Sequence, residues 1–159
     1  MVLVLIFRAK VYATAVALLT TSLVTLPTAQ GIAIAKPVPI AIIVHESVIL
    51  GSAKNLIGTP YCRGGSSPRC FDCSGFTQYI YKQHGIDLPR TVEDQRRAVR
   101  KISAADAMPG DLVFFVTKKG YAYHVGIYVG NGKVLHSPKR GQKVRIVNIW
   151  THNVRFGRV

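Results

Sequence analysis

The hydrophobic and polar positions divide the chain into three stretches with different patterns. Residues 11–35 carry no charged side chain, and residues 44–100 have apolar side chains at helical spacing between loops. Residues 112–157 form short apolar runs separated by turns. Helices that precede a set of strands predict an α+β domain, in which the helices pack on an antiparallel sheet of about five or six strands.

Three helices are predicted, and each has a recognisable boundary signal. Asp72 and Thr91 are good N-cap residues, because their side-chain oxygens can accept hydrogen bonds from the free backbone N–H groups of a first turn. Gly58 and Gly85 are typical of the position after a helix end. The predicted helices are residues 44–57, Cys73–His84 and Thr91–Arg100. Residues 59–71 are rich in glycine, serine and proline and are expected to form a loop.

The second half of the chain predicts strands that are joined by glycine-containing turns. The predicted strands are Leu112–Val116, Tyr121–Val129, Lys133–Ser137, Val144–Ile149 and a short one near Val154–Gly157. No internal repeat or low-complexity tract occurs. The length therefore allows one compact domain, which we expect at residues 44–159.

The uncharged stretch near the N-terminus predicts an export segment. Arg8 and Lys10 precede the apolar run, and Ala33-Ile34-Ala35 has the small-x-small form of a signal cleavage site. Residues 1–35 are therefore predicted to be a signal peptide or a retained membrane anchor, and residues 36–43, with two prolines, a linker. Either form directs the rest of the chain to the periplasm, the cell wall or the medium. A buried core helix is a weaker alternative, because cap residues are missing.

The charge narrows the classes of partner. The 159 residues include 21 Lys and Arg against 7 Asp and Glu, a formal net charge of +14. Loss of Arg8 and Lys10 with the export segment leaves 19 basic and 7 acidic residues, a charge of +12. A basic exported domain meets anionic wall polymers and lipid head groups, so we expect weak attraction to these and no nucleic acid partner.

Cys73, His124 and His136 together predict nucleophilic catalysis. Cys73 lies in the first turn of a predicted helix, whose positive N-terminus stabilises a thiolate and is expected to lower the thiol pKa. His124 and His136 fall in neighbouring predicted strands. One histidine can take the thiol proton while the other orients it through the second ring nitrogen, which is the logic of a catalytic triad.

The hairpin between the two histidines tests this hypothesis, because side chains alternate between the faces of a sheet. A strict two-residue turn at Asn131-Gly132 would separate His124 and His136 onto opposite faces. A three-residue loop, Gly130-Asn131-Gly132, or an odd-length or bulged equivalent, pairs Gly126 with His136 and brings both imidazoles to one face. We predict the second arrangement.

The sequence resembles the NlpC/P60 family of cysteine peptidases in three motifs. Members of this family are papain-like enzymes that cut peptidoglycan stem peptides. The three motifs are DCSGF at a predicted helix start, HVGIY in a separate strand and a third polar residue, His136, in the next strand. The resemblance implies a papain-like NlpC/P60 fold with N-terminal helices packed on the sheet. It also implies a monomer that needs no cofactor or metal, acts on stem peptides and hydrolyses a γ-D-glutamyl bond to a diamino acid.

The resemblance also implies roles by position. Cys73 is similar to the family's nucleophile, His124 to its general base and His136 to the residue that orients the base. Tyr61, in the motif GTPY, is similar to a tyrosine whose hydroxyl helps to stabilise the oxyanion. Positions that flank the family's substrate groove correspond to Asp72, Ser74 and Arg90.

The two other cysteines depart from the family pattern. In an exported protein Cys62 and Cys70 are expected to form a disulfide that closes the loop before Cys73. Three alternatives stay open: a redox pair of Cys70 and Cys73, a zinc site that adds a histidine to the three cysteines, and two free buried thiols.

Two other functions fit the same residues. A related amidase or acyltransferase would use the same cysteine–histidine pair on another linkage. A non-catalytic module that binds cell wall or lipid would keep only the scaffold. Digestion of defined stem peptides distinguishes an endopeptidase from the amidase or acyltransferase. Reaction of Cys73 with a thiol-directed electrophile distinguishes an enzyme from the non-catalytic module.

Overall fold

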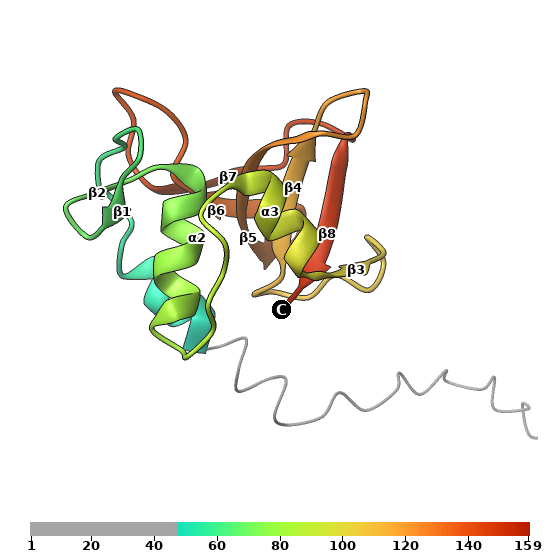
Figure 1. Ribbon diagram of the computed structural model, residues 1–159, viewed down its shortest axis with the longest axis horizontal. Helices are drawn as coiled ribbons and strands as arrows, with labels where there is room; N and C mark the ends of the chain where they lie inside the picture. Colours follow the sequence, from blue (N-terminus) through green and yellow to red (C-terminus); the bar gives the residue numbers. More distant parts are fainter. Residues whose placement is uncertain (1–47) are drawn as a thin grey trace, which may run out of the picture. The chain divides into compact units, whose positions relative to one another are not determined.

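The computed structural model describes residues 48–159, which form a layer of helices packed on a sheet (Figure 1). The predicted α+β class is confirmed. The predicted export segment, the linker and the first residues of the first predicted helix lie outside the described residues. Within residues 48–159 no helix is long and apolar enough to cross a membrane.

The helices have the capping residues that the sequence predicts. Residues 48–54 are helical and are followed by turns, so this helix ends at residue 54 and not at 57. Helix α2 (Cys73–Lys82) is capped by Asp72, and helix α3 (Val92–Ala98) is capped by Thr91. Each of these two side chains accepts a hydrogen bond from a backbone N–H of the first turn, which explains why the helices begin where they do.

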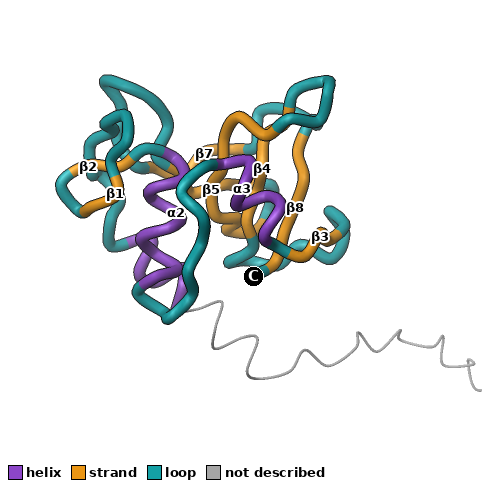
Figure 2. Tube along the Cα trace, viewed as in Figure 1, coloured by secondary structure: helices purple, strands orange, loops and turns teal. Residues whose placement is uncertain are grey.

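The main sheet has six antiparallel strands in the order β3-β8-β4-β5-β6-β7 (Figures 1 and 2). The strands are β3 (Arg100–Ile102), β4 (Leu112–Val116), β5 (Ala122–Gly130), β6 (Lys133–His136), β7 (Arg145–Asn148) and β8 (Val154–Arg158). Strands β5 and β6 carry His124 and His136 and are neighbours, which makes this hairpin the part of the sheet that matters most for the site.

Alternation along β4 gives the sheet two apolar faces. Leu112, Phe114 and Val116 belong to the larger core, which also contains buried residues of α2, whereas Val113 and Phe115 belong to a smaller cluster. Helix α2 packs against β5 and β6, and α3 packs against β5. The start of α2 is therefore held beside the strands that carry the two histidines.

The sequence pattern did not predict strand β3, because it extended the third helix to Arg100. In the structure this helix ends at Ala98. Val99 leaves the helical conformation with φ −100° and ψ 153°. Its buried side chain packs so closely on Gly157 of β8 that a Cβ atom there would lie 2.3 Å from the Val99 Cγ2 atom. The prediction of a helix as far as Arg100 was wrong, because this contact favours an extended backbone.

The predicted loop at residues 59–71 contains two short strands, β1 (Ser66–Ser67) and β2 (Cys70–Phe71), which pair with each other. The segment before them pairs with the loop that precedes β7, since the backbone N–H of Tyr61 donates to the carbonyl oxygen of Gln142 at 2.9 Å. Two loops that are far apart in the sequence thus lie side by side, and Tyr61 lies in the first of them.

Candidate active site

Asp72 positions the start of α2, and with it Cys73. Its carboxylate accepts hydrogen bonds from the backbone N–H groups of Gly75 at 2.7 Å and of Gly64 at 2.9 Å. Gly75 fits here because it has no side chain, since a Cβ atom would lie 2.0 Å from the carbonyl oxygen of Gly65. The loop therefore rests directly on the first turn of the helix, and this contact fixes the backbone of Cys73.

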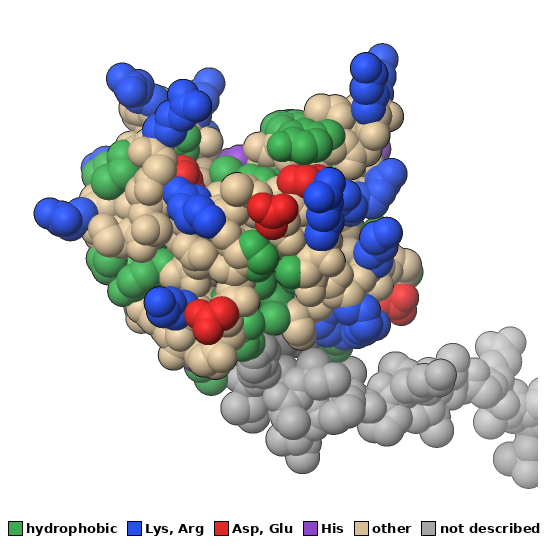
Figure 3. Space-filling view, in the orientation of Figure 1, with side chains coloured by type: hydrophobic (Ala, Val, Ile, Leu, Met, Phe, Trp, Pro, Cys, Tyr) green, Lys and Arg blue, Asp and Glu red, His purple; other side chains and the backbone are tan. Residues whose placement is uncertain are grey.

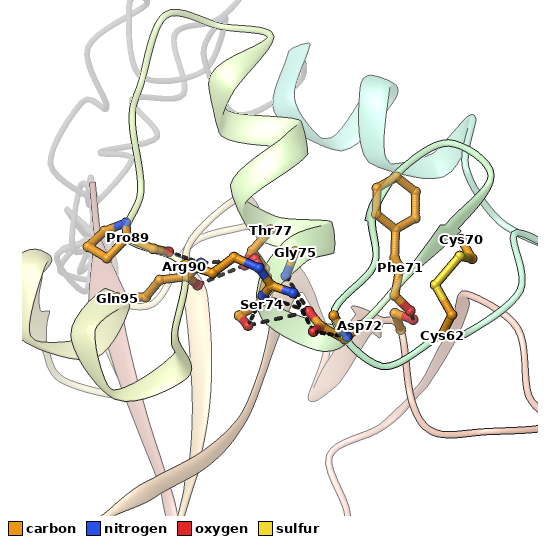
Figure 4. Close-up of polar contacts among 12 residues, drawn as sticks. Cys62, Cys70, Phe71, Asp72, Ser74, Gly75, Thr77, Pro89, Arg90 and Gln95 are labelled. Atoms are coloured by element: carbon orange, nitrogen blue, oxygen red, sulfur yellow. Dashed lines mark hydrogen bonds and ion pairs between the residues drawn. A yellow bond between two sulfur atoms is a disulfide. The ribbon is translucent and has the colours of Figure 1, made fainter.

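A bidentate ion pair joins Asp72 to Arg90, and Figure 4 shows the two side chains facing each other. The guanidinium of Arg90 donates to the two carboxylate oxygens at 3.0 and 2.5 Å and to the hydroxyl of Ser74 at 2.9 Å. The hydrogen bonds that Arg90 donates to Asp72 raise the pKa of Arg90. The three residues that are predicted to flank the groove are thus brought together in one network.

Gln95 of α3 anchors the same region from within the protein (Figure 4). Its side chain is fully buried, and its amide nitrogen donates to the carbonyl oxygens of Ser74 at 2.9 Å and of Pro89 at 2.8 Å. Its amide oxygen accepts a hydrogen bond from the hydroxyl of Thr77 at 2.8 Å. Both the nitrogen and the oxygen of the buried Gln95 amide are hydrogen-bonded. Gln95 therefore links α2 to the segment between α2 and α3 that carries Arg90.

Glu93 connects α3 to β5 just before His124. Its carboxylate accepts a hydrogen bond from the backbone N–H of Ala122 at 3.0 Å and forms ion pairs with Arg96 and Arg97. The hydrogen bonds from Arg96 and from Ala122 lower the pKa of Glu93 to about 2. The carboxylate is therefore ionised at neutral pH and holds the start of β5 against the helix layer.

The predicted register of the β5–β6 hairpin is confirmed in its bulged form. Asn131 and Gly132 form a turn with φ of 50° and 66°, and a bulge follows because Tyr128 pairs with Val134 whereas Gly130 pairs with Lys133. The bulge shifts the register by one residue, so His124 and His136 lie on the same face. His124 Nε2 and His136 Nδ1 are 2.7 Å apart.

This hydrogen bond sets the roles of the ring nitrogens. If Nδ1 of His124 is to take a proton from Cys73, Nε2 must carry the hydrogen and donate it to His136. His136 then carries its own hydrogen on Nε2, which is buried and has no hydrogen-bond partner among the described residues. The arrangement leaves Nδ1 of His124 as the free basic atom of the pair.

Cys73 lies in reach of the segment that carries His124. Cys73 and His124 line one cavity, and α2, which begins at Cys73, packs on β5, which carries His124. Two cavities meet at Cys73, and both are also lined by Tyr61 and Tyr123. We call the first, of about 670 Å³, the histidine cavity, because His124 and His136 line it together with Pro138, Lys139, Gln142, Arg145, Val147, Asn148 and Trp150.

The second cavity, of about 600 Å³, is called the helix cavity. The starts of α2 and α3 line it, and its residues include Asp72, Ser74, Arg90 and Glu93. The structure thus assembles the predicted site residues around one cysteine. The histidines lie on one side, the Asp72 network lies on the other, and Tyr61 borders both.

The family model described as "NlpC/P60 family" matches residues 58–155, which is more than half of the chain. The chain belongs to the NlpC/P60 family. The solved NlpC/p60 domain of the peptidoglycan hydrolase SagA is 39% identical, with a TM-score of 0.64 over 70% of this chain and 95% of that one. The implied NlpC/P60 fold is thereby confirmed.

Two curated relatives are also similar to this chain. "Probable endopeptidase p60" of Listeria seeligeri is 46% identical over 114 residues, or 70% of this chain and 22% of that protein. "Gamma-D-glutamyl-L-lysine dipeptidyl-peptidase" of Bacillus subtilis is 43% identical over 103 residues, or 64% of this chain and 35% of that protein. The chain thus spans between a fifth and two fifths of the length of these relatives.

The pKa of the candidate nucleophile differs from the expectation. Burial raises the pKa of the Cys73 thiol, and the Asp72 carboxylate adds to this, although backbone hydrogen bonds oppose it. Burial lowers the pKa of His124 to about 4, and burial together with the charges of His124 and Arg145 lowers that of His136 to about 3. In this NlpC/P60 domain the resting pair is therefore a neutral thiol and a neutral imidazole. The helix N-terminus alone predicts a lowered thiol pKa, but desolvation outweighs it.

Trp150 is part of this NlpC/P60 site, and the sequence did not single it out. Its ring stacks on Phe115 with a centroid distance of 3.9 Å, and the His136 ring lies 5.4 Å away. Half of the indole is exposed, and it lines the histidine cavity. The available signal was that the single tryptophan of the chain follows directly on the last residues of a predicted strand.

The structure joins Cys62 and Cys70 in a disulfide and leaves Cys73 with a free thiol (Figure 4). The backbone N–H of Cys62 donates to the carbonyl oxygen of Phe71, and that of Gly65 donates to Cys62. The disulfide therefore braces the loop that rests on the first turn of α2. Among the described residues no group of three His, Cys, Asp or Glu side chains is arranged to hold a metal ion.

Proposed function

We propose that the chain is a cysteine endopeptidase that hydrolyses the γ-D-glutamyl bond to the diamino acid in peptidoglycan stem peptides. One observation carries the proposal most directly. Cys73 opens into a cavity whose wall contains the 2.7 Å His124–His136 pair, and the free ring nitrogen of His124 is the basic atom. Membership of a family with peptidoglycan hydrolases and a γ-D-glutamyl dipeptidyl-peptidase among its relatives supports the substrate.

The mechanism begins from the neutral pair. As the Cys73 sulfur attacks the peptide carbonyl carbon, Nδ1 of His124 takes the thiol proton, and His136 keeps the ring oriented. The backbone N–H of Cys73 and the hydroxyl of Tyr61 stabilise the oxyanion. His124 then gives its proton to the leaving amine. Finally it takes a proton from the water that attacks the thioester and gives this proton to the departing Cys73 sulfur, which restores the thiol and releases the carboxylic acid.

Export belongs to the same proposal, because peptidoglycan lies outside the cytoplasmic membrane. Residues 1–35 act as a signal peptide or anchor. The disulfide of Cys62 and Cys70 supports this, since disulfides persist in oxidising compartments. The basic side chains that stand out on the face seen in Figure 3 support weak attraction to anionic wall polymers. Cell fractionation and a thiol count of the mature protein test the export.

Digestion of defined muropeptides with mass analysis of the products tests the activity. The expected products are those of cleavage after the γ-D-glutamyl residue. Cys73→Ala and His124→Ala should each lower kcat by at least about 10³-fold, because a nucleophile and its base act as a unit. His152→Ala is the matched control, since His152 is exposed and lines neither cavity.

The alternatives predict other outcomes of the same digestion. Release of intact stem peptides from the glycan would indicate an amidase. Failure to cleave any muropeptide, together with failure of Cys73 to react with iodoacetamide near neutral pH, would indicate a non-catalytic module. Circular dichroism of each variant shows whether the fold is kept.

A further inference from the structure

The histidine cavity is lined by cations and by no anion. Lys139 and Arg145 both contribute to its wall, whereas none of its lining residues is an aspartate or a glutamate. The surrounding sequence has the same character, since residues 112–159 contain nine Lys and Arg and no Asp or Glu. The helix cavity differs, because Asp72 and Glu93 line it together with Arg90 and Arg63.

These two cations are available to a ligand. Lys139 and Arg145 are exposed, and the ion pairs within residues 48–159 all use other cations. Arg145 donates a hydrogen bond at 3.0 Å to the side-chain oxygen of Gln142, which is a neutral group. The two histidines are uncharged at neutral pH because burial lowers their pKa values to about 4 and 3. The cavity therefore carries two positive charges that form no ion pair with any carboxylate of residues 48–159.

The direction of the substrate in the groove follows from the position of the acid. His124 lines the histidine cavity and not the helix cavity. A general acid must lie within hydrogen-bond reach of the amine that it protonates. The leaving amine, and the amino acid attached to it, are therefore on the side of Lys139 and Arg145, and the acyl part is on the side of Arg90.

We propose that Lys139 and Arg145 select stem peptides whose diamino acid ends in a free side-chain carboxylate over those that end in a carboxamide or only an ammonium group. This inference rests on the proposed function and names its substrate class more closely. A carboxylate can pair with both cations, whereas a lone ammonium group is repelled by them. Since both cations are exposed, each pair contributes modestly, and together they amount to about a tenfold preference.

Three peptides that differ only at the end of one side chain test the proposal. Each is L-Ala-γ-D-Glu-X with an amidated α-carboxyl group, where X is meso-diaminopimelate, its side-chain carboxamide or L-lysine. We expect kcat/KM to be about tenfold higher for the carboxylate than for the carboxamide, and lower still for lysine. In the double variant Lys139→Gln/Arg145→Gln the preference should fall to about twofold or less, and high salt should weaken it in the wild type.

The preference is compared within each variant, so any change in the catalytic histidines affects both substrates and cancels. Arg100→Gln/Lys101→Gln removes the same two charges from β3, at the opposite edge of the sheet from β7, and should keep the preference. Equal cleavage of carboxylate and carboxamide by the wild type, or a preference that survives Lys139→Gln/Arg145→Gln, overturns the inference while the proposed function stands. Cleavage of none of the three peptides overturns the proposed function itself.

Discussion

The two cavities that meet at Cys73, which together form the groove, are built in different ways. The helix cavity is formed by the starts of two helices and a braced loop. Of its charged side chains, Asp72 forms an ion pair with Arg90, and Glu93 forms one with Arg96 of the same helix. The histidine cavity is formed by strands and loops at the sheet edge, and Lys139 and Arg145 there have no carboxylate partner among the described residues.

This difference separates two tasks. A charge that is held in a network keeps a fixed position, so the helix cavity can fix the nucleophile and the acyl part of a substrate. A charge without a partner can respond to the ligand, so the histidine cavity can distinguish one leaving group from another. Changes to the first side should therefore alter stability together with rate, whereas changes to the second should alter rate or selectivity with the fold kept.

After the loss of Cys73 or His124 itself, the largest effect is expected on the histidine side from His136→Ala. Without a hydrogen-bond partner for its Nε2 atom, His124 loses its orientation and tautomer, so kcat should fall about 10²- to 10³-fold with KM nearly unchanged. His136→Asn keeps an acceptor oxygen near the position of Nδ1 and should recover most of that loss. Steady-state kinetics on one muropeptide measures both variants. A fall in kcat that is equally large for His136→Asn would show that His136 does more than orient His124.

The next effect is expected on the helix side from Gly75→Ala. The new Cβ atom would lie 2.0 Å from the carbonyl oxygen of Gly65, so the loop must move. We expect a loss of about 3 kcal/mol in the free energy of unfolding, as for other overpacked sites. Gly51→Ala is the matched control, because no atom lies within 4 Å of its Cβ position and alanine favours a helix. That control should gain up to about 1 kcal/mol. Urea unfolding measures both, and an unchanged midpoint for Gly75→Ala would contradict the prediction.

A smaller loss is expected from Asp72→Asn. Asparagine still caps α2, but only one oxygen remains to accept from Gly64, Gly75 and Arg90, and the ion pair is lost. The free energy of unfolding should fall by about 2 kcal/mol. Asp94→Asn is the control, because the Asp94 carboxylate is exposed on α3 and bonds only the Thr91 side chain, so its effect should stay within about 0.5 kcal/mol. Equal losses in the two variants would mean that the Asp72 network adds nothing to an ordinary helix cap.

The sequence predicted those parts of the fold whose signals are local. The cap at Asp72, strand β4 and the register that unites His124 with His136 follow from neighbouring residues, because caps, alternation and turn glycines act over a few positions. Strand β3 depends instead on the contact of Val99 with Gly157, which are far apart in the sequence, so no local pattern could show it.

In the candidate site, too, the sequence predicted the features that depend on local signals and missed those that depend on the whole fold. The sequence predicted which residues gather at Cys73, but it gave the wrong direction for the thiol pKa, since burial depends on the whole fold. Trp150 was missed for a similar reason. Its position beside His136 results from the packing on Phe115 across the sheet, and a lone tryptophan after a strand carries no specific signal.

The smallest effect concerns acid pH, and it tests whether the histidine side stays uncharged. His124 must be neutral to act as a base, and burial lowers its pKa to about 4. Activity should therefore fall by less than about twofold between pH 7 and pH 5, whereas a histidine with the ordinary pKa near 6.5 would lose about 25-fold. The acid limb of kcat/KM should lie near pH 4, as measured under conditions in which circular dichroism shows the folded protein. A limb near pH 6.5 would contradict the prediction and would mean that burial does not lower the pKa of His124.

Stability should respond at higher pH than activity does, and this gives an independent check. The unfolded chain takes up protons on His124 and His136 near pH 6.5, whereas the folded protein does so only near pH 4 and 3. Between these values the unfolded state binds more protons, so stability is full above about pH 6.5 and is lost as the pH falls toward 4. The urea midpoint should thus decrease from pH 7 to pH 5 while activity is nearly constant. His136→Asn should reduce this decrease, because it removes one of the two groups that titrate only after unfolding.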